Sequence, residues 1–495
     1  MAPDPGLGRL RVAVRAVLGV TFAVAVVQLS GLPLTASITG GLAALLALFT
    51  VGDPTVRRQV NTTALLPVVG FPVLALAAGL HGLPLVRDAA FLAVVFCGVY
   101  ARRWGPRGNA LGIFGFMMFF ATQFLHAVPA QLPHLYTAMV MSLAAAGTVR
   151  FGFWCIERRT PPPAGPAPLA GSGLARVTTR QAFQTAFACG LALAVGQMVS
   201  DERWYWAVGT AWWIFVNTAS RGETLVRGFR RVLGTLMGIA TGMVVALPLH
   251  GAPAPTAALV AVCVFGIFYT AAVSYTWMMF AVTVMAGLLY GLLGVLDADL
   301  LTLRLAQTGV GAAGAALAVL LVLPVTTHAT TDAWIQRALR CVHACAAEAA
   351  ARLAGSETAD PAPRVSELEL LLGRVRLSLA PLVHPLNPFR ARKEKARRVL
   401  ALLDGCAREV RGLASVAADP EASHDERLAA ACWRVEAAVE ALTTPGKSRD
   451  AAVASAAPEH LPAEPALAHL HDLERTLAEL AAPLRSTRPS PLVGA

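Results

Sequence analysis

The chain has 495 residues, of which 56% are hydrophobic and only 14% are charged. A soluble domain carries about 25% charged residues, so this sequence folded in water would expose large apolar patches. The composition therefore argues against an ordinary soluble protein. It predicts an integral membrane protein, because a bilayer accommodates such apolar surface.

The net charge of +11 lies entirely in the first two thirds of the chain. Residues 1–330 hold 20 Arg and Lys against 9 Asp and Glu, and residues 331–495 hold 21 against 21. The densest basic run, residues 390–398, contains no aromatic residue. These features argue against nucleic-acid binding and predict basic residues beside anionic lipid headgroups.

Twelve apolar stretches are candidates for membrane spans, each of which needs about 20 residues. The first begins after Arg9, Arg11 and Arg15 like a signal peptide, but it lacks a clear cleavage site and is expected to be retained. The stretches are residues 12–30, 34–52, 63–80, 86–100, 110–127, 136–155, 180–199, 204–219, 232–249, 256–273, 277–295 and 302–324.

The distribution of arginine residues supports this count. With the N-terminus in the cytoplasm, seventeen arginines of the first 330 residues fall on the cytoplasmic side, and only Arg87, Arg203 and Arg304 fall outside. Loops on the cytoplasmic side carry such an excess. We therefore expect a multi-pass protein of a bacterial inner membrane with both termini in the cytoplasm.

The domain organisation follows from the breaks between these stretches. Residues 1–156 and 180–325 form two six-helix halves, joined by the Pro- and Gly-rich linker 157–179. Both halves begin on the same side, which is typical of a parallel duplication in transporters. Residues 326–495 are predicted to form a cytoplasmic helical domain with a flexible tail. The predicted fold class is all-α.

Motifs for catalysis or for a cofactor are not found. The segment TPGKS at 444–448 lacks the first glycine of a phosphate loop, because position 441 is Ala441. Cys341 and Cys345 share a helix face, whereas His343 points away, so no metal site is predicted. The eight cysteines include no CxxC pair and are expected to be free thiols. We predict that the chain is not an enzyme.

One stretch, residues 201–240, carries a specific pattern. An aromatic cluster at Trp204–Trp206 opens a span, and a Ser-Arg-Gly-Glu-Thr-Leu loop follows at 220–225. An Arg-x3-Thr-x2-Gly motif comes next, and a second one follows beyond this stretch, in the last expected span. Together these features resemble the fusaric acid resistance protein family, which includes the aromatic acid exporters. The motifs are Arg231, Thr235, Gly238 and Arg304, Thr308, Gly311.

The resemblance implies export of small organic anions, especially aromatic carboxylic acids, driven by an ion gradient. An anion channel of the same architecture and a non-transporting membrane scaffold are alternatives. The halves are also similar to the six-span subunits of plant malate channels, which form dimers. On that analogy, the two halves here surround one pathway.

Transport of an anion requires polar groups that face the interior of the bundle. Arg304 can equally serve as an anchor at the headgroups. For Gln123 and His126 a structural polar role is the more frequent one, and for Trp213 a packing role. Membrane lipids and small organic anions are the expected partners, and the C-terminal domain is expected to assemble a homo-oligomer. The candidates for the pathway are Arg304, Gln307, Gln123, His126, Trp213, Asn217 and Arg221.

Overall fold

The structure is a computed structural model, and the part of the chain that it describes is all helical, without a strand. The chain divides into two compact units: residues 1–162 with 168–324, and residues 325–495 with 163–167. The described residues are 7–157, 173–216, 218, 220–246, 248–249, 251–323, 327–353, 356, 358–383, 390–417, 426–443 and 465–485.

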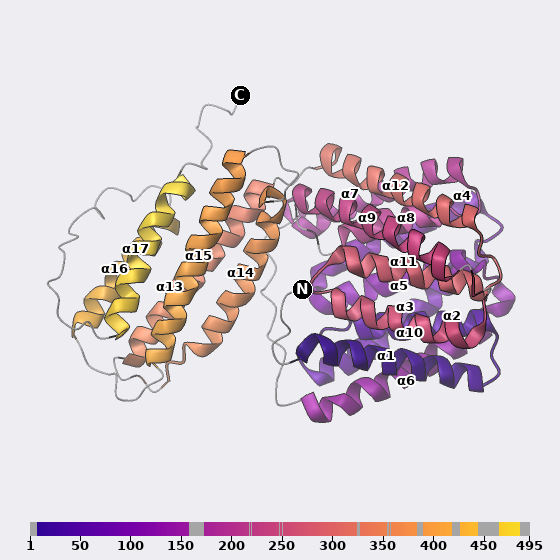
Figure 1. Cartoon of the computed structure of the whole chain (residues 1–495), viewed down its shortest axis with the longest axis horizontal. Coiled ribbons are helices and arrows are strands. Elements are labelled where there is room, and N and C mark those ends of the chain that lie inside the picture. The colour runs from indigo at the N-terminus through magenta and orange to yellow at the C-terminus, as the bar shows by residue number, and fades with distance from the viewer. Residues whose placement is uncertain are drawn as a thin grey trace. The chain divides into compact units, whose positions relative to one another are not determined.

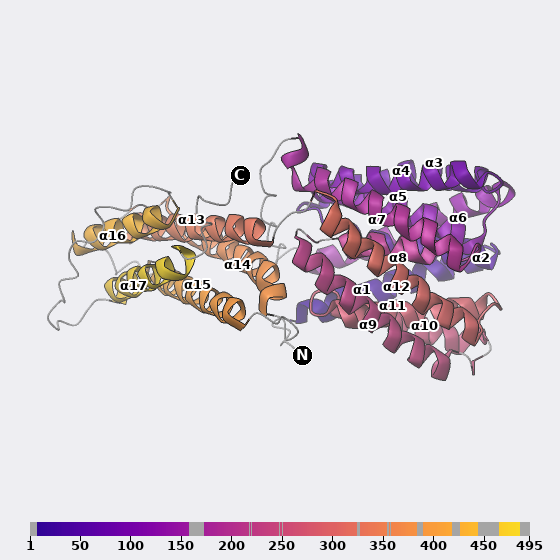
Figure 2. The same ribbon diagram turned by 90° about the horizontal axis from the view of Figure 1, so that it is seen from above.

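The first unit is a bundle of long helices that run side by side (Figures 1 and 2). Its first six α-helices are α1 (Gly8–Leu29), α2 (Leu34–Thr50), α3 (Val56–Gly79), α4 (Pro84–Tyr100), α5 (Gly105–Leu125) and α6 (Leu132–Glu157). The next six are α7 (Val177–Val199), α8 (Tyr205–Phe215), α9 (Arg221–Val245), α10 (Pro253–Thr270), α11 (Tyr275–Leu292) and α12 (Ala298–Leu321). Short 3-10 turns include η2 (Ala101–Trp104) between α4 and α5.

Several of these helices are long and apolar enough to cross a membrane. Among the described residues eight stretches meet that condition, and one of them, Pro84–Leu125, holds both α4 and α5. Of the remaining helices, α2 has 17 residues, α8 has 11, and α9 carries four arginines in its first half. The all-α membrane fold is confirmed, and the count of twelve crossings stays a prediction.

Helix α8 is unusually short for its position. Its 11 residues extend over about 16 Å, roughly half of a hydrocarbon core about 30 Å thick. Every residue of α8 except Trp213 is buried, and the helix packs against α7, α9, α12 and α5 (Figures 1 and 2). Of the span expected over 204–219, residues 205–215 form a short buried helix, and the described residues Val216 and Thr218 are not helical.

The end of α8 needs hydrogen-bond donors, because Phe215 and Thr218 are buried and buried backbone carbonyl groups are normally paired within the protein. Arg102 Nη1 donates to the carbonyl oxygen of Phe215 at 2.9 Å. Gln181 Nε2 donates to the carbonyl oxygen of Thr218. Side chains of both halves therefore hold the point at which α8 stops.

Helix pairing in the second half repeats that of the first half. In the first half α1 packs against α2 and α6, and in the second half α7 packs in the same way against α8 and α12. Likewise, α5 packs against α3 and α4, and α11 packs against α9 and α10. Between the halves, α4 packs on α7 and α10 packs on α1. The end of α2 is also held by a side chain, since Arg150 donates to the carbonyl oxygens of Ala47 and Val51. This is the pattern that a parallel duplication produces.

Close contact between α8 and α12 depends on Gly311. A Cβ atom at this position would lie 2.7 Å from Thr210 Cβ and 3.0 Å from the backbone nitrogen of Ala211. Gly311→Ala should lower the free energy of unfolding by about 1–3 kcal/mol, as overpacking does. Thermal unfolding in detergent measures this, and Gly309→Ala is the control, because nothing lies within 4 Å of its Cβ position. Equal stability of the two variants would contradict the close packing.

The second unit is a helical bundle with its own apolar core. Helix α13 packs against α14, α15 and α16, and α17 packs against α15 and α16. Leucines from four of the helices, including Leu339, Leu371, Leu403 and Leu470, are fully buried. The five helices are α13 (Thr327–Leu353), α14 (Ala362–Val383), α15 (Arg390–Ala417), α16 (Glu426–Thr443) and α17 (Pro465–Arg485).

Candidate functional site

Four arginines lie inside the first unit, around α8, α9 and α12. We call Arg102, Arg227, Arg231 and Arg304 the arginine row. Arg231 and Arg304 are 6% and 4% exposed, respectively. A buried guanidinium in a membrane bundle is costly and is by default a hypothesis for a functional site.

The first two members lie at the end of the bundle where α8 ends and α9 begins, which we call the Arg102 end. Arg102 lies in the turn η2, and its Cζ is 5.7 Å from the ring centroid of Trp212. Arg227 lies on α9 and stacks over the Tyr275 ring at 3.9 Å. The two guanidinium groups are close enough to repel each other electrostatically.

Arg231 follows Arg227 one turn later on the same side of α9. Its Nη1 donates to the hydroxyl oxygen of Tyr275 at 3.3 Å and lies 2.8 Å from the sulfur of Met279. Tyr275 therefore touches both Arg227 and Arg231. The four-residue spacing places the two guanidinium groups one above the other along the helix.

Arg304 lies at the opposite end, where α8 and α12 begin, which we call the Arg304 end. Its Cζ is 3.9 Å from the ring centroid of Trp206 on α8. The Arg231 guanidinium is close enough to repel that of Arg304 electrostatically. Beyond it, Arg203 lies in the loop before α8 and donates to the Tyr205 hydroxyl at 3.2 Å. Each of the four arginines of the row therefore contacts an aromatic residue of the bundle.

No carboxylate among the described residues pairs with a member of the row. The ion pair within the described part of the bundle joins Arg87 to Asp88 at 2.9 Å, near the Arg304 end. Stacking on an aromatic ring stabilises a desolvated cation by about 2 kcal/mol, which offsets only part of the cost of burial. The row therefore has a net positive charge that an anion can neutralise.

Several donors of the row have no hydrogen-bond partner among the described residues. They are Arg304 Nη1, Arg231 Nε, Arg227 Nε, and Nε and Nη2 of Arg102. Buried donors are normally paired, so each orphan requires an explanation. Oxygen atoms of a ligand would satisfy these N–H groups.

Aromatic side chains of the first half form a wall beside the row. The Phe116 ring of α5 stacks on Trp212 of α8, with centroids 4.0 Å apart and an interplanar angle of 5°. Phe120 contacts Trp206 edge to face at 5.2 Å. The first half thus contributes ring surface, whereas three of the four cations come from the second half.

Among the predicted residues that the structure describes, Gln307 lies beside Arg304, one turn further along α12. It is fully buried, and its Nε2 donates to the carbonyl oxygen of Gly196 at 3.0 Å. Its Oε1 has no partner among the described residues. Gln123 is buried near the end of α5, and His126 caps that helix at a positive φ of 50° with an exposed side chain.

The other predicted residues lie apart from the row. Trp213 is partly exposed and meets Trp212 edge to face at 5.5 Å. Arg221 is the first residue of α9 and is exposed. Asn217 lies outside the described residues.

Sequence reasoning missed Arg102 as a member of the site. It was counted as a topology signal because it follows a predicted span in a basic cluster. Its partner Phe215 is 113 residues away, so no local pattern could have joined them. Arg227 and Arg231 are among the seventeen arginines assigned to the cytoplasmic side, and Arg231 also belongs to one of the two motifs.

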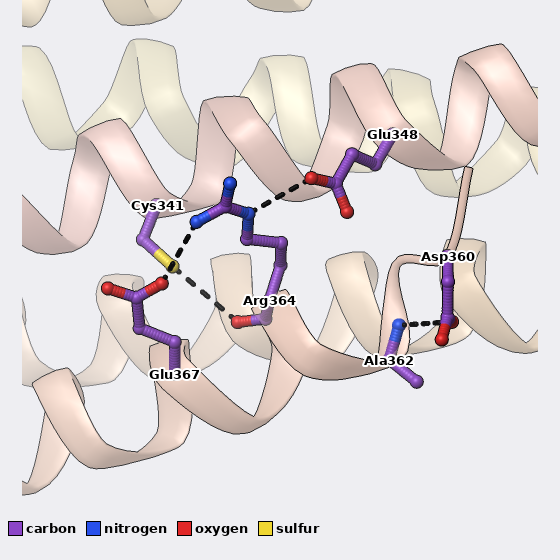
Figure 3. A network of polar contacts seen from close by, with 6 residues as sticks. All are labelled: Cys341, Glu348, Asp360, Ala362, Arg364 and Glu367. Atoms are coloured by element: carbon purple, nitrogen blue, oxygen red, sulfur yellow. Dashed lines mark hydrogen bonds and ion pairs between the residues drawn. The ribbon is translucent and has the colours of Figure 1, made fainter. Parts of the chain in front are cut away.

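The cysteines of the second unit form no metal cluster among the described residues. Cys341 Sγ donates to the carbonyl oxygen of Arg364 at 3.5 Å, and the Arg364 guanidinium bonds Glu348 and Glu367 (Figure 3). A hydrogen bond with Cys345 lowers the pKa of the Cys341 thiol. These contacts tie α13 to α14 and give this cluster a structural role.

The segment that carries most of the row has known relatives. Residues 188–318 match the fusaric acid resistance protein-like family. The resemblance based on the Ser-Arg-Gly-Glu-Thr-Leu loop and the two Arg-x3-Thr-x2-Gly motifs is thereby confirmed for this segment. Together with the apolar helices, the match shows a membrane protein whose architecture fits a transporter. No curated protein matches the chain.

Both motifs of this family segment have the same structural use. Each arginine is buried, and the glycine seven residues later lies on the same helix face. Gly238 lets α11 approach, because a Cβ there would lie 2.6 Å from Thr283 Cβ. Gly311 of α12 likewise allows the close approach of α8. Each motif thus places a buried arginine and a glycine at a close helix contact on the same face of one helix.

Proposed function

We propose that this protein is a secondary transporter that exports small organic anions, in particular aromatic carboxylic acids, using an ion gradient. The observation that carries this proposal is the arginine row, whose buried donors have no carboxylate partner among the described residues. Carboxylates accept hydrogen bonds from guanidinium groups in a strong planar arrangement. The neighbouring rings of Trp212 and Phe116 suit an aromatic body.

The placement in the cell is part of the same proposal. Residues 1–156 and 180–325 form two halves around one path in a bacterial inner membrane, and both termini lie in the cytoplasm. Residues 326–495 form a cytoplasmic domain that assembles copies of the chain. Membrane lipids contact the apolar outer surface, and neither nucleic acid nor a cofactor takes part.

Inside-out vesicles with an acidified lumen test the function. Labelled aromatic and aliphatic carboxylates should accumulate in vesicles that contain the protein, and an uncoupler should abolish this accumulation. A weak acid that crosses lipid unaided collects on the alkaline side, so accumulation in the acidic lumen requires the protein. Vesicles without the protein are the control.

Two other outcomes are informative. Equilibration of the acids without accumulation would indicate a channel of the same architecture. If no acid of a broad panel moves although the protein is folded, transport of organic acids is contradicted.

A further inference from the structure

A hydrogen-bonded aromatic group lies directly behind Arg304. Trp206 Nε1 donates to the Tyr290 hydroxyl at 2.6 Å, and the hydroxyl groups of Tyr290 and Tyr205 are 3.2 Å apart. Tyr290 is 1% exposed and Trp206 is 8% exposed. Both polar ring groups are therefore satisfied without water, which fixes the positions of the two rings.

The same group is supported from two further directions. Phe120 of α5 meets the Trp206 ring edge to face, with centroids 5.2 Å apart. Phe124 packs on Tyr290 with centroids 5.0 Å apart. The Trp206 indole cannot turn without breaking these contacts, so its face is held toward Arg304.

The guanidinium of Arg304 stacks on that face at 3.9 Å from Cζ to the ring centroid. Stacking fixes the plane of a guanidinium but leaves its edge available, because N–H groups point outward in the plane. At this edge Arg304 Nη1 has no partner among the described residues. The ring thus orients the donor that an anion would meet.

We propose that Tyr290 is a positioning residue for anion binding, which acts through Trp206 on the Arg304 guanidinium. This inference rests on the proposed function, since it concerns the affinity of the same site. Loss of the Tyr290 hydroxyl lets the indole rotate, and the Arg304 edge then spends less time in the orientation that binds an anion. The affinity falls because fewer molecules are ready to bind.

Tyr290→Phe tests this with little disturbance, because the ring stays and only the hydroxyl is lost. Binding of labelled benzoate to the purified full chain in detergent should weaken about two- to tenfold, as expected for one hydrogen bond. Tyr136→Phe is the matched control. It removes a hydroxyl that donates to the carbonyl oxygen of Phe71 at 3.1 Å, away from the row, and it should bind benzoate like the wild type.

A double-mutant cycle separates positioning from a general loss of stability. Lysine at position 304 has no planar group to orient, so Tyr290→Phe should have no further effect in an Arg304→Lys background. Independent, additive effects would overturn the proposal. Tyr205→Phe, which leaves the bond between Trp206 and Tyr290 in place, should have a smaller effect than Tyr290→Phe, and an equal or larger one would also overturn it.

The failure of this inference can be distinguished from that of the proposed function. If the wild type binds benzoate and Tyr290→Phe binds it equally well, only the positioning role falls. If neither the wild type nor the variant binds any carboxylate, the arginine row is no anion site and both proposals fall.

Discussion

Arg304→Ala should reduce carboxylate transport about thirtyfold or more. Removal of one partner from a buried charge pair costs about 2–5 kcal/mol, and each 1.4 kcal/mol is a factor of about ten. The transport rate of Arg304→Lys should lie between those of the wild type and Arg304→Ala, because lysine keeps the charge but loses the planar donors. The initial rate of gradient-driven uptake in vesicles measures both variants.

Folding must be controlled in this experiment. Arg304 is buried without a carboxylate partner among the described residues, so its removal relieves a charge and should not lower the thermal stability. A stable Arg304→Ala protein that transports like the wild type would show that Arg304 only anchors its helix.

Arg231→Ala and Arg230→Ala should differ strongly although the residues are adjacent. Arg231 points into the bundle and touches Tyr275 and Met279, whereas Arg230 is half-exposed. Successive residues of a helix point about 100° apart. Arg231→Ala should raise the Michaelis constant for carboxylates at least tenfold, and Arg230→Ala should leave it within about twofold.

Comparison of these two variants distinguishes an arginine that contacts the substrate in the bundle from one that only contributes to the surface potential. Both variants remove one positive charge from the same turn of α9, so a general effect of charge on anion attraction would change them equally. Equal Michaelis constants for the two variants would contradict the arginine row.

The helices could be predicted from the sequence because their signal is local. Each of the twelve expected spans coincides with part of a helix, and the family motifs already pointed to Arg231 and Arg304. The short length of α8 was not predicted, because the span expected over 204–219 also included the polar residues Asn217 and Thr218, which follow the end of the apolar run at Val216. Hydropathy reports where a segment is buried, and it does not report where the backbone leaves the helix.

The arrangement of the site could not be predicted for a different reason. Arg102, Tyr290 and Arg304 come from distant parts of the chain and meet only through the packing of the bundle. His126 illustrates a related limit, because it lies in the stretch expected over 110–127, whereas α5 ends at Leu125 and His126 has a positive φ of 50°. A side chain after a helix end no longer follows the helical periodicity.

The repeated pairing of helices has an evolutionary meaning. In the first half, α3 and α6 correspond to α9 and α12, which carry arginines of the row. The arginines of α3, Arg57 and Arg58, lie in its first turn, and Arg150 of α6 donates to carbonyl groups at the end of α2. Two identical subunits related by symmetry must carry every side chain twice. A fused gene is free of this restriction, so one copy can keep the cations while the other evolves into the aromatic wall.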